Sequence, residues 1–343
     1  MKKKDIKSIT LDELIEEFLS LGIKKYKAEQ VFKWLSKYVT SFEEMSDLSK
    51  DLRDFLDSRY EILSASVLKR EISKDGTIKF AIMFDDGSVV ESVLMKYKFG
   101  NSICVSTQVG CKMRCEFCAN SNLSFYRNLS VSEIILQVQI VSNYEKVNIS
   151  NITLMGIGEP FDNYDNVIKF INIATCQKGM NIGARRISVS TCGILDKIRK
   201  FADEKLGVTL SVSLHSVKND LRSKIMPINR VHNLESLHDA CKYYNLKTNK
   251  RISFEYIMLK NINDSKDDAK LLAKFLKDLI FHVNLIPANN VGSGNLAPCS
   301  IEKVHIFANW LINYGINVTV RRTLGSDISA SCGQLRSQIL KEQ

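Results

Sequence analysis

The residues best suited to chemistry are three cysteines crowded into eight positions. Cys111, Cys115 and Cys118 follow the spacing C-x3-C-x2-C. Cysteine thiolates hold iron-sulfur clusters, and a 4Fe-4S cubane held by only three of them keeps one iron open to a substrate. A structural zinc site is the alternative, because Cys104 or a distant histidine could complete a tetrahedron. The spacing favours the cluster and leaves zinc open.

Composition and charge narrow the class of protein. The chain has 343 residues, of which 45% are hydrophobic, so it can bury the core of one large domain and a smaller one. Its charged start leads into no apolar stretch of membrane-spanning length, so we expect a cytoplasmic protein without membrane attachment. In a reducing compartment, nine cysteines indicate metal or redox chemistry rather than a disulfide framework. The net charge of +10 favours a nucleic acid partner, although a basic surface can also serve solubility alone.

Residue periodicity divides the chain into four segments. Residues 1–65 carry apolar residues at helical spacing and predict a small N-terminal helical domain. Residues 66–100 hold two Asp-Gly turns between alternating runs, which predicts a β-hairpin linker. Residues 101–325 alternate β-branched runs with helical patterns, which is typical of an α/β domain with a parallel sheet, and 326–343 form a C-terminal loop and tail. The expected parallel strands are 103–107, 152–155, 187–191, 208–214, 252–258, 283–286 and 318–320.

Several expected strands carry polar side chains on one face, although the strands of a parallel sheet are normally apolar on both faces. A partial (β/α) barrel explains this alternation if a polar ligand lies in its interior, toward the C-terminal ends of the strands. An amphipathic sheet with one solvated face is the alternative. The residues expected to face the interior are Arg186, Ser188, Ser190, Thr209, Ser211, Ser213, His215, Ser253 and Glu255.

The cysteine motif resembles the signature loop of the radical S-adenosylmethionine superfamily, including the aromatic Phe117 before its last cysteine. Five further motifs, in the same order, resemble the RlmN/Cfr family of adenosine methyltransferases. The resemblance extends from Leu11 to Leu335, which is nearly the whole chain. These motifs are CVSTQVGC at 104–111, MGIGEP at 155–160, SLH at 213–215, MPIN at 226–229 and DISASCGQL at 327–335.

The resemblance implies a radical S-adenosylmethionine barrel that holds one 4Fe-4S cluster on Cys111, Cys115 and Cys118. The open iron would chelate S-adenosylmethionine, and one-electron cleavage of the sulfonium would give a 5'-deoxyadenosyl radical. By residue type alone, a glycine at a strand end more often only makes a turn, and His215 could be a satisfied core histidine. The residues implied to contact S-adenosylmethionine are Gly158, Glu159, Ser190, Ser213, Leu214, His215 and Asn289.

The resemblance also implies roles in methyl transfer, because carbon 2 or 8 of adenine is too electron-poor for simple methyl-cation donation. One S-adenosylmethionine would methylate Cys332, and a second would supply the radical that removes hydrogen from this methyl group. After the carbon adds to the base, Glu91 would remove the ring proton and Cys104 would attack Cys332, which leaves a disulfide to be reduced. By type alone, Glu91 could be a solvated surface charge and Cys332 a small hydrophobe. The cysteines expected to be inert are Cys176, Cys192, Cys241 and Cys299.

The expected function is methylation of carbon 2 of an adenosine in 23S ribosomal RNA and, as in many family members, in transfer RNA. We expect a monomer that receives electrons from a protein such as flavodoxin. Carbon-8 methylation of the Cfr type is the alternative, and Pro160 favours carbon 2 because Cfr sequences tend to carry alanine there. A zinc-stabilised RNA-binding module is the non-enzymatic alternative. The candidate RNA-binding residues are Lys24, Lys25, Lys27, Lys33, Lys37, Arg185, Arg186, Arg321 and Arg322.

The sequence departs from the family pattern at three places near the expected site. Asn120 lies in a stretch, 119–122, where small residues are usual. Lys96 stands where proline is common, and Val291 replaces the proline of an Asn-Pro step. These departures put substrate range or loop geometry in doubt, and none removes an expected ligand.

Overall fold

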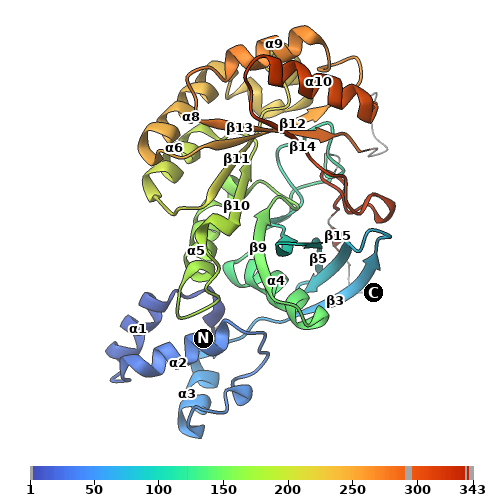
Figure 1. The fold of residues 1–343 in the computed structure, drawn as a ribbon. Coiled ribbons are helices and arrows are strands. Elements are labelled where there is room, and N and C mark those ends of the chain that lie inside the picture. Colours follow the sequence, from blue (N-terminus) through green and yellow to red (C-terminus); the bar gives the residue numbers. More distant parts are fainter. Residues whose placement is uncertain (1–2, 122, 290–295, 337, 340–343) are drawn as a thin grey trace.

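The N-terminal part of the chain folds as a small helical unit. The structure, a computed structural model, describes residues 3–121, 123–289, 296–336 and 338–339. Figure 1 shows the first three helices (blue) grouped at one end of the molecule. The first helix begins with a capping box, in which Thr10 and Glu13 satisfy each other's backbone N–H groups. The bounds are α1 (Leu11–Ser20), α2 (Lys25–Leu35) and α3 (Lys50–Arg59), with the parallel pair β1 (Lys4–Asp5) and β2 (Tyr60–Glu61) beside them.

The segment after this unit forms antiparallel strands, as the Asp-Gly turns predict. Gly76 and Gly87 have φ angles of +87° and +76°, the left-handed region that these tight turns require. These strands continue into the main sheet, because the strand at 100–104 pairs antiparallel with the strand at 88–97 and parallel with the strand at 149–154. Their bounds are β3 (Ala65–Ile72), β4 (Ile78–Phe84), β5 (Ser88–Tyr97) and β6 (Gly100–Cys104).

The remaining strands confirm the predicted partial barrel. Within the described residues the sheet runs in the order β14-β13-β12-β11-β10-β9-β6-β5-β4-β3, and every pair from β6 to β14 is parallel. The path ends at β14 and β3, so it does not close on itself. The strand bounds are β9 (Ile149–Leu154), β10 (Ile187–Thr191), β11 (Thr209–Ser213), β12 (Ile252–Met258), β13 (Phe281–Pro287) and β14 (Val318–Val320).

Helices connect the parallel strands and lie along the outside of the curved sheet (Figure 1). Each expected β-branched run overlaps a strand, and the largest difference is at 103–107, of which only 103–104 belong to β6. None of the helices in the described ranges has the length and apolar character needed to cross a lipid bilayer. The helix bounds are α4 (Val131–Glu145), α5 (Tyr164–Thr175), α6 (Leu195–Glu204), α7 (Asn219–Ile225), α8 (Leu234–Thr248), α9 (Lys266–Phe275) and α10 (Ile301–Asn313).

Helix α4 joins the N-terminal unit to the sheet and is buried along most of its length. The Gln139 side chain accepts a hydrogen bond from Lys7 Nζ (2.8 Å) and donates one to the Leu35 carbonyl (2.8 Å). Lys7 also donates to the Val39 carbonyl (3.0 Å), so both of these hydrogen-bond acceptors are uncharged. Burial therefore lowers the pKa of Lys7 to about 8.

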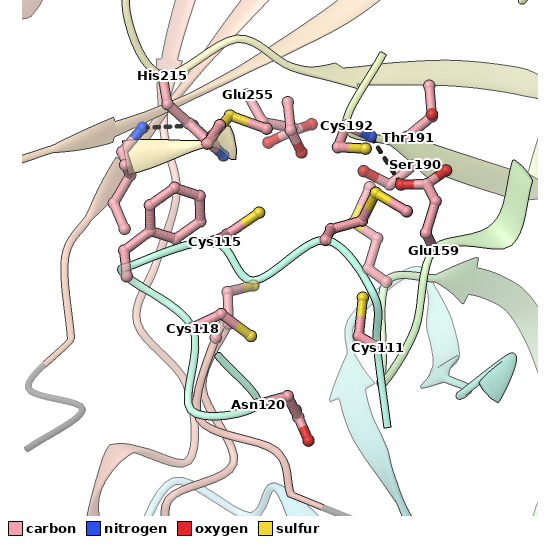
Figure 2. A pocket seen from close by; sticks show the side chains of 18 of the residues that line it. Cys111, Cys115, Cys118, Asn120, Glu159, Ser190, Thr191, Cys192, His215 and Glu255 are labelled. Atoms are coloured by element: carbon pink, nitrogen blue, oxygen red, sulfur yellow. Dashed lines mark hydrogen bonds between the residues drawn. The ribbon is translucent and has the colours of Figure 1, made fainter. Parts of the chain in front are cut away.

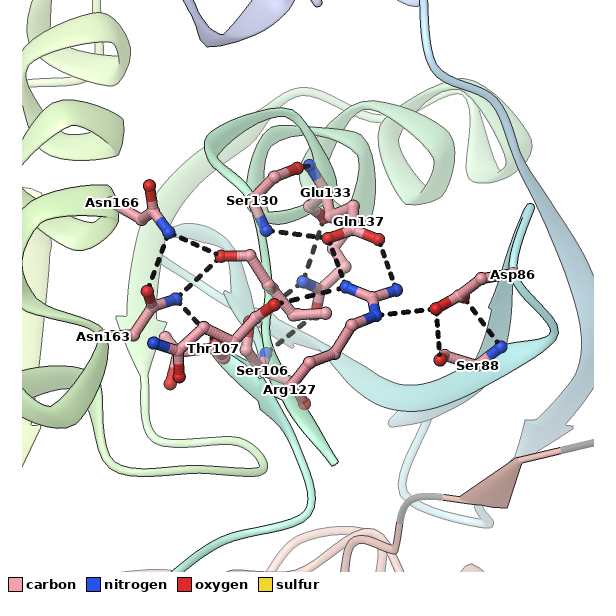
Figure 3. A network of polar contacts seen from close by, with 12 residues as sticks. Asp86, Ser88, Ser106, Thr107, Arg127, Ser130, Glu133, Gln137, Asn163 and Asn166 are labelled. Atoms are coloured by element: carbon pink, nitrogen blue, oxygen red, sulfur yellow. Dashed lines mark hydrogen bonds and ion pairs between the residues drawn. The ribbon is translucent and has the colours of Figure 1, made fainter. Parts of the chain in front are cut away.

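A polar network beside α4 fixes the loop that leads from β6 to the cysteines (Figure 3). Arg127 forms ion pairs with Asp86 in the β4–β5 turn (2.7 Å) and with Glu133 on α4 (2.7 Å). The Gln137 side chain binds both the N–H (2.8 Å) and the C=O (3.0 Å) of Ser106. The loop is further held by the antiparallel pair β7 (Gln108–Val109) and β8 (Arg127–Asn128).

Candidate active site

Two adjoining cavities lie in the barrel: the first at the C-terminal ends of the parallel strands, and the second reaching back toward the N-terminal end of β10. The first, of about 180 Å³, is lined by Cys111, Cys115 and Cys118 and is called here the cysteine cavity. The second, of about 290 Å³, is lined by Cys104 and is called the Cys104 cavity. The two share a wall, so a group carried by that wall can face either space. The residues of the shared wall are Cys118, Met155, Gly156, Arg321, Cys332 and Gly333.

The three motif cysteines lie on one loop and line the cysteine cavity (Figure 2). The loop is docked on the end of α7, because Glu116 N–H donates to the Ile225 carbonyl (2.9 Å). Among the residues that the structure describes, no three His, Cys, Asp or Glu side chains converge as ligands of a single metal ion. Three thiols spread along one cavity wall are the donor set that a cubane takes.

Burial keeps these thiols protonated until a metal binds. It raises the pKa of Cys111 to about 12 and that of Cys115 well above its usual value. A bound iron would displace the protons, since coordinating thiols are deprotonated. The residues present therefore fit a 4Fe-4S cluster.

The MGIGEP motif needs its glycines because atoms of neighbouring residues lie directly against them. A Cβ on Gly156 would come within 2.6 Å of the Val105 carbonyl oxygen, and one on Gly158 within 2.6 Å of Gln108 Cβ. Gly158 also has a φ of +104°. Both residues line the cysteine cavity, and a bare backbone there lets a ligand approach closely. The glycines thus do more than make a turn.

Glu159 follows these glycines as a buried carboxylate at the cavity wall (Figure 2). Its oxygens accept hydrogen bonds from Cys192 N–H (2.8 Å) and Phe161 N–H (3.0 Å). Burial raises the pKa of Glu159, and these backbone donors oppose the rise. The side chain is held in one orientation against the cavity.

The SLH motif is divided between the cavity and the core. Ser213 and His215 line the cysteine cavity together with Ser190, as their alternation predicts. The Leu214 side chain lies instead in the hydrophobic core with no exposed surface. Leu214 uses its backbone to bind the Glu255 carbonyl (3.0 Å). The predicted inward face is therefore confirmed for the polar members of the motif.

His215 is both a fixed core residue and a cavity residue. Its Nδ1 accepts the Ile257 N–H (3.1 Å), and its ring meets Phe117 edge-on at 4.6 Å. Burial, reinforced by the charge of Arg222, lowers the pKa of His215 to about 3. The imidazole is therefore neutral at pH 7, with its proton assigned to Nε2 because Nδ1 is an acceptor.

Cys332 belongs to the shared wall and is exposed, whereas Cys104 lines only the Cys104 cavity. Burial raises the pKa of Cys104 to about 12. Arg321 Nη1 lies 3.9 Å from the Cys332 Sγ and 3.5 Å from a Glu255 oxygen. Asn289 donates to the Cys332 carbonyl (3.1 Å) and is not among the residues that line either cavity. Val291 lies outside the described residues.

Glu91 lies on β5, but the structure does not place it among the residues lining either cavity. One carboxylate oxygen pairs with the buried Lys79 (3.2 Å), and the other accepts the Arg336 N–H (2.8 Å). Val93, two residues along the same strand, lines the Cys104 cavity. Glu91 therefore sits just beyond this cavity, with the C-terminal segment bound to it.

The C-terminal segment, here residues 333–336 and 338–339, crosses from the cysteine loop (111–121) to β5. Ala119 N–H donates to the Gly333 carbonyl (2.7 Å), and the Asn120 side chain donates to the Leu335 carbonyl. Strand β15 (Gln338–Ile339) then pairs antiparallel with β5. The departure from the family pattern at Asn120 thus provides a buried clamp for this segment, while Lys96 lies near Glu145 (3.8 Å) and is half exposed.

The candidate RNA-binding residues fall into two groups. Arg185, Arg186 and Arg321 line the Cys104 cavity, whereas the lysines at 24–37 lie on or beside α2 at the other end of the molecule. Arg322 is not among the lining residues of either cavity. Sequence patterns missed Arg222 and Lys79, which are buried cations, and gave no sign that Arg321 lies beside Cys332.

Comparisons with known proteins agree with this geometry. Residues 105–273 match the model of the Radical SAM superfamily, and residues 4–62 match that of the ribosomal RNA large subunit methyltransferase N-terminal domain. Probable dual-specificity RNA methyltransferases RlmN are similar over nearly the whole chain. The one from Thermoanaerobacter sp. (strain X514) is 48% identical over 99% of both chains, and that from Caldanaerobacter subterraneus subsp. tengcongensis is 49% identical over 98% of this chain and 99% of its own.

A crystal structure of a radical SAM methyltransferase from Sphaerobacter thermophilus superposes with a TM-score of 0.90 at 38% identity. It covers 97% of this chain and 99% of that chain. Streptococcus suis SuiB, in a crystal structure with S-adenosylmethionine, has a TM-score of 0.50 at 14% identity over 64% of this chain and 50% of its own. This second likeness concerns the fold alone.

Proposed function

Because the chain belongs to the RlmN family of radical S-adenosylmethionine RNA methyltransferases, we propose that it methylates carbon 2 of an adenosine. The substrates are 23S ribosomal RNA and transfer RNA, a range supported by the words "dual-specificity" in the names of the relatives. The protein acts as a monomer and receives electrons from a donor protein such as flavodoxin. Pro160, at the start of a short 3-10 helix after Glu159, favours carbon 2 over carbon 8.

The observation that carries the proposal is the position of Cys332 in the wall between the two cavities. The cysteine cavity accommodates the cluster and S-adenosylmethionine, held by Cys111, Cys115 and Cys118. The Cys104 cavity receives the adenine, which must leave its stack to reach it. A methyl group on the Cys332 sulfur is then within reach of both spaces.

When bound, the cluster and two molecules of S-adenosylmethionine supply a methyl group and a radical that abstracts hydrogen. The chain itself binds and orients these groups. Glu159, already fixed by two backbone donors, and His215, a neutral donor through Nε2, present polar atoms to the cysteine cavity. The proposed S-adenosylmethionine contacts are Gly158, Glu159, Ser190, the run 213–215 and Asn289.

The remaining steps use three side chains. The Cys332 sulfur accepts the methyl group and later presents its carbon to the adenine. Glu91 takes the ring proton, which requires it to leave its bonds to Lys79 and Arg336. The Cys104 sulfur then attacks the Cys332 sulfur as the bond from Cys332 to the transferred carbon breaks, and that carbon takes a proton to become the methyl group. The unpaired electron of the adduct would return to the bound cluster, and the disulfide that remains needs a two-electron reductant.

Two measurements test the proposal in sequence. Anaerobically purified protein should carry about four irons per chain, and a triple variant with alanine at Cys111, Cys115 and Cys118 should carry none. One zinc and no visible chromophore would instead support the RNA-binding module. RNA mass spectrometry of cells lacking the gene and then expressing it should show 2-methyladenosine on expression, and 8-methyladenosine would assign the Cfr-type activity.

A further inference from the structure

Arg222, on α7, is a fully buried cation without a carboxylate partner. Its guanidinium donates to four uncharged oxygens, and its side chain has no exposed surface. Three of these are backbone carbonyls at the ends of β10 and β11, and the fourth belongs to a neighbouring amide. The bonds run from Nε to Leu214 O (3.1 Å), from Nη1 to Asn229 Oδ1 (2.9 Å), and from Nη2 to Cys192 O (2.7 Å) and Ser213 O (3.1 Å).

Such a charge is costly unless an anion compensates it, because a buried cation loses its hydration and uncharged acceptors restore only part of that lost free energy. Among the residues that the structure describes, Arg222 forms no ion pair with an aspartate or glutamate. Its Nη2 donates to the Cys192 carbonyl (2.7 Å), and Cys115 of the cysteine loop packs against the side-chain group that contains Cys192. A cluster held on that loop would therefore place its negative charge on this side of Arg222.

The cysteine loop lies directly beside this charge. Cys115 packs with Cys192, Ile225 and Met226 in one group of side chains, and Cys192 separates Arg222 from the cysteine cavity. The last residue of α7, Ile225, accepts the backbone N–H of the loop at Glu116 (2.9 Å). One short helix thus supports the cysteine loop and carries the buried cation behind it.

We propose that Arg222 is the counter-charge of the iron-sulfur cluster, a positioning residue that raises the reduction potential of the cluster and holds the strand ends around it. This inference rests on the proposed function, because it needs a cluster on Cys111, Cys115 and Cys118. The negative charge of three thiolates exceeds the positive charge of the cubane core, and reduction adds one more electron. A cation fixed in a low-dielectric wall stabilises the reduced form more than the oxidised form.

The test separates the effect of the positive charge from that of the guanidinium hydrogen bonds. Arg222→Lys keeps the charge and loses the branched set of hydrogen bonds, whereas Arg222→Gln removes the charge. The readout is the midpoint potential from an electron paramagnetic resonance titration, with iron content measured on the same samples. In Arg222→Gln, the ratio of reduced to oxidised cluster at a fixed potential should fall about tenfold, which is 59 mV for a one-electron couple. Arg222→Lys should stay within about twofold of wild type. Arg230→Gln, at an exposed position after α7, makes the same charge change as a control.

An unchanged potential in Arg222→Gln with a full complement of iron would overturn the inference and leave the proposed function intact. A wild-type protein without iron would refute the proposed function itself. A second measurement needs no variant. Hydrogen exchange at residues 213–216 and 219–229 should slow when the cluster is reconstituted into wild-type protein, more than exchange in α9, because loading compensates the buried charge. Equal exchange with and without the cluster would overturn the role of Arg222 even if its variants fail to fold.

Discussion

Replacing Gly158 with alanine should destabilise the fold and disturb the cysteine cavity. The backbone at Gly158 has a φ of +104°, which an L side chain adopts at a cost of about 1–3 kcal/mol. The new Cβ would also lie 2.6 Å from Gln108 Cβ and 2.9 Å from Gln108 N, and relief of such overpacking costs about another 1–3 kcal/mol. The two effects together predict a loss of about 2–6 kcal/mol in the free energy of unfolding.

Three other glycines separate these two contributions. Gly76 has a φ of +87° and open space, so alanine there measures backbone strain alone. Gly156 has an ordinary φ and a backbone oxygen 2.6 Å from the new Cβ, so alanine there measures overlap alone. Gly183 has neither constraint and serves as the control, with an expected change within about 0.5 kcal/mol.

Urea unfolding of the cluster-free variants, followed by circular dichroism, would measure the four free energies. The Gly158→Ala loss should be close to the sum of the Gly76→Ala and Gly156→Ala losses. The change should also weaken S-adenosylmethionine binding to the loaded protein, because the Gln108 side chain accepts the Glu159 N–H (2.8 Å) and would be displaced. A Gly158→Ala protein as stable as Gly183→Ala would refute the reasoning.

Three further predictions concern methyl transfer, burial and RNA binding. Cys332→Ala should keep its iron and still cleave S-adenosylmethionine, but RNA mass spectrometry should find no methylated product. Cys176→Ala, the matched control, should retain activity. Normal turnover without Cys332 would refute the mechanism. The pKa of Lys7 is lowered to about 8 in the folded protein, so between about pH 8 and 10.5 the unfolded chain binds more protons than the folded one. The free energy of unfolding should therefore rise with pH in this range relative to Lys7→Met, as measured by urea titration. A difference between the two proteins that does not change with pH would contradict this. Replacing Arg185 and Arg186 with glutamine should weaken transfer RNA binding and reduce the slope of log K against log salt by about 1–2, and an unchanged slope would place both side chains away from the phosphates.

The sequence was informative wherever local pattern determines structure. The β-branched runs predicted each parallel strand of the described residues, because every one of these strands keeps an apolar face that packs against the core even where its other face is polar. Alternation along 208–215 correctly turned Ser213 and His215 inward, because successive side chains on a strand point to opposite faces. The same rule places Leu214 in the core, which the motif resemblance alone did not convey.

Contacts between distant segments were beyond reach of local pattern. The bonds of Arg222 to Cys192 and Leu214 depend on how α7 packs behind two strand ends, and nothing in the spacing of these residues indicates it. The placement of Glu91 against Lys79 and Arg336 likewise follows from strand register and from the path of the C-terminal segment. Periodicity gives the face of a side chain but not its neighbour on another element.

The path of the C-terminal segment has a consequence for the order in which the site is built. Residues 333–336 bind Ala119, Asn120 and Glu91, all of which leave the ribosome more than two hundred residues earlier in the chain. Synthesis proceeds from the N-terminus, so the barrel can form while this side of the cysteine loop is still uncovered. The wall behind Cys118 is therefore completed after the barrel strands, and the nascent chain leaves the cysteine loop open on that side until residues 333–336 have been made.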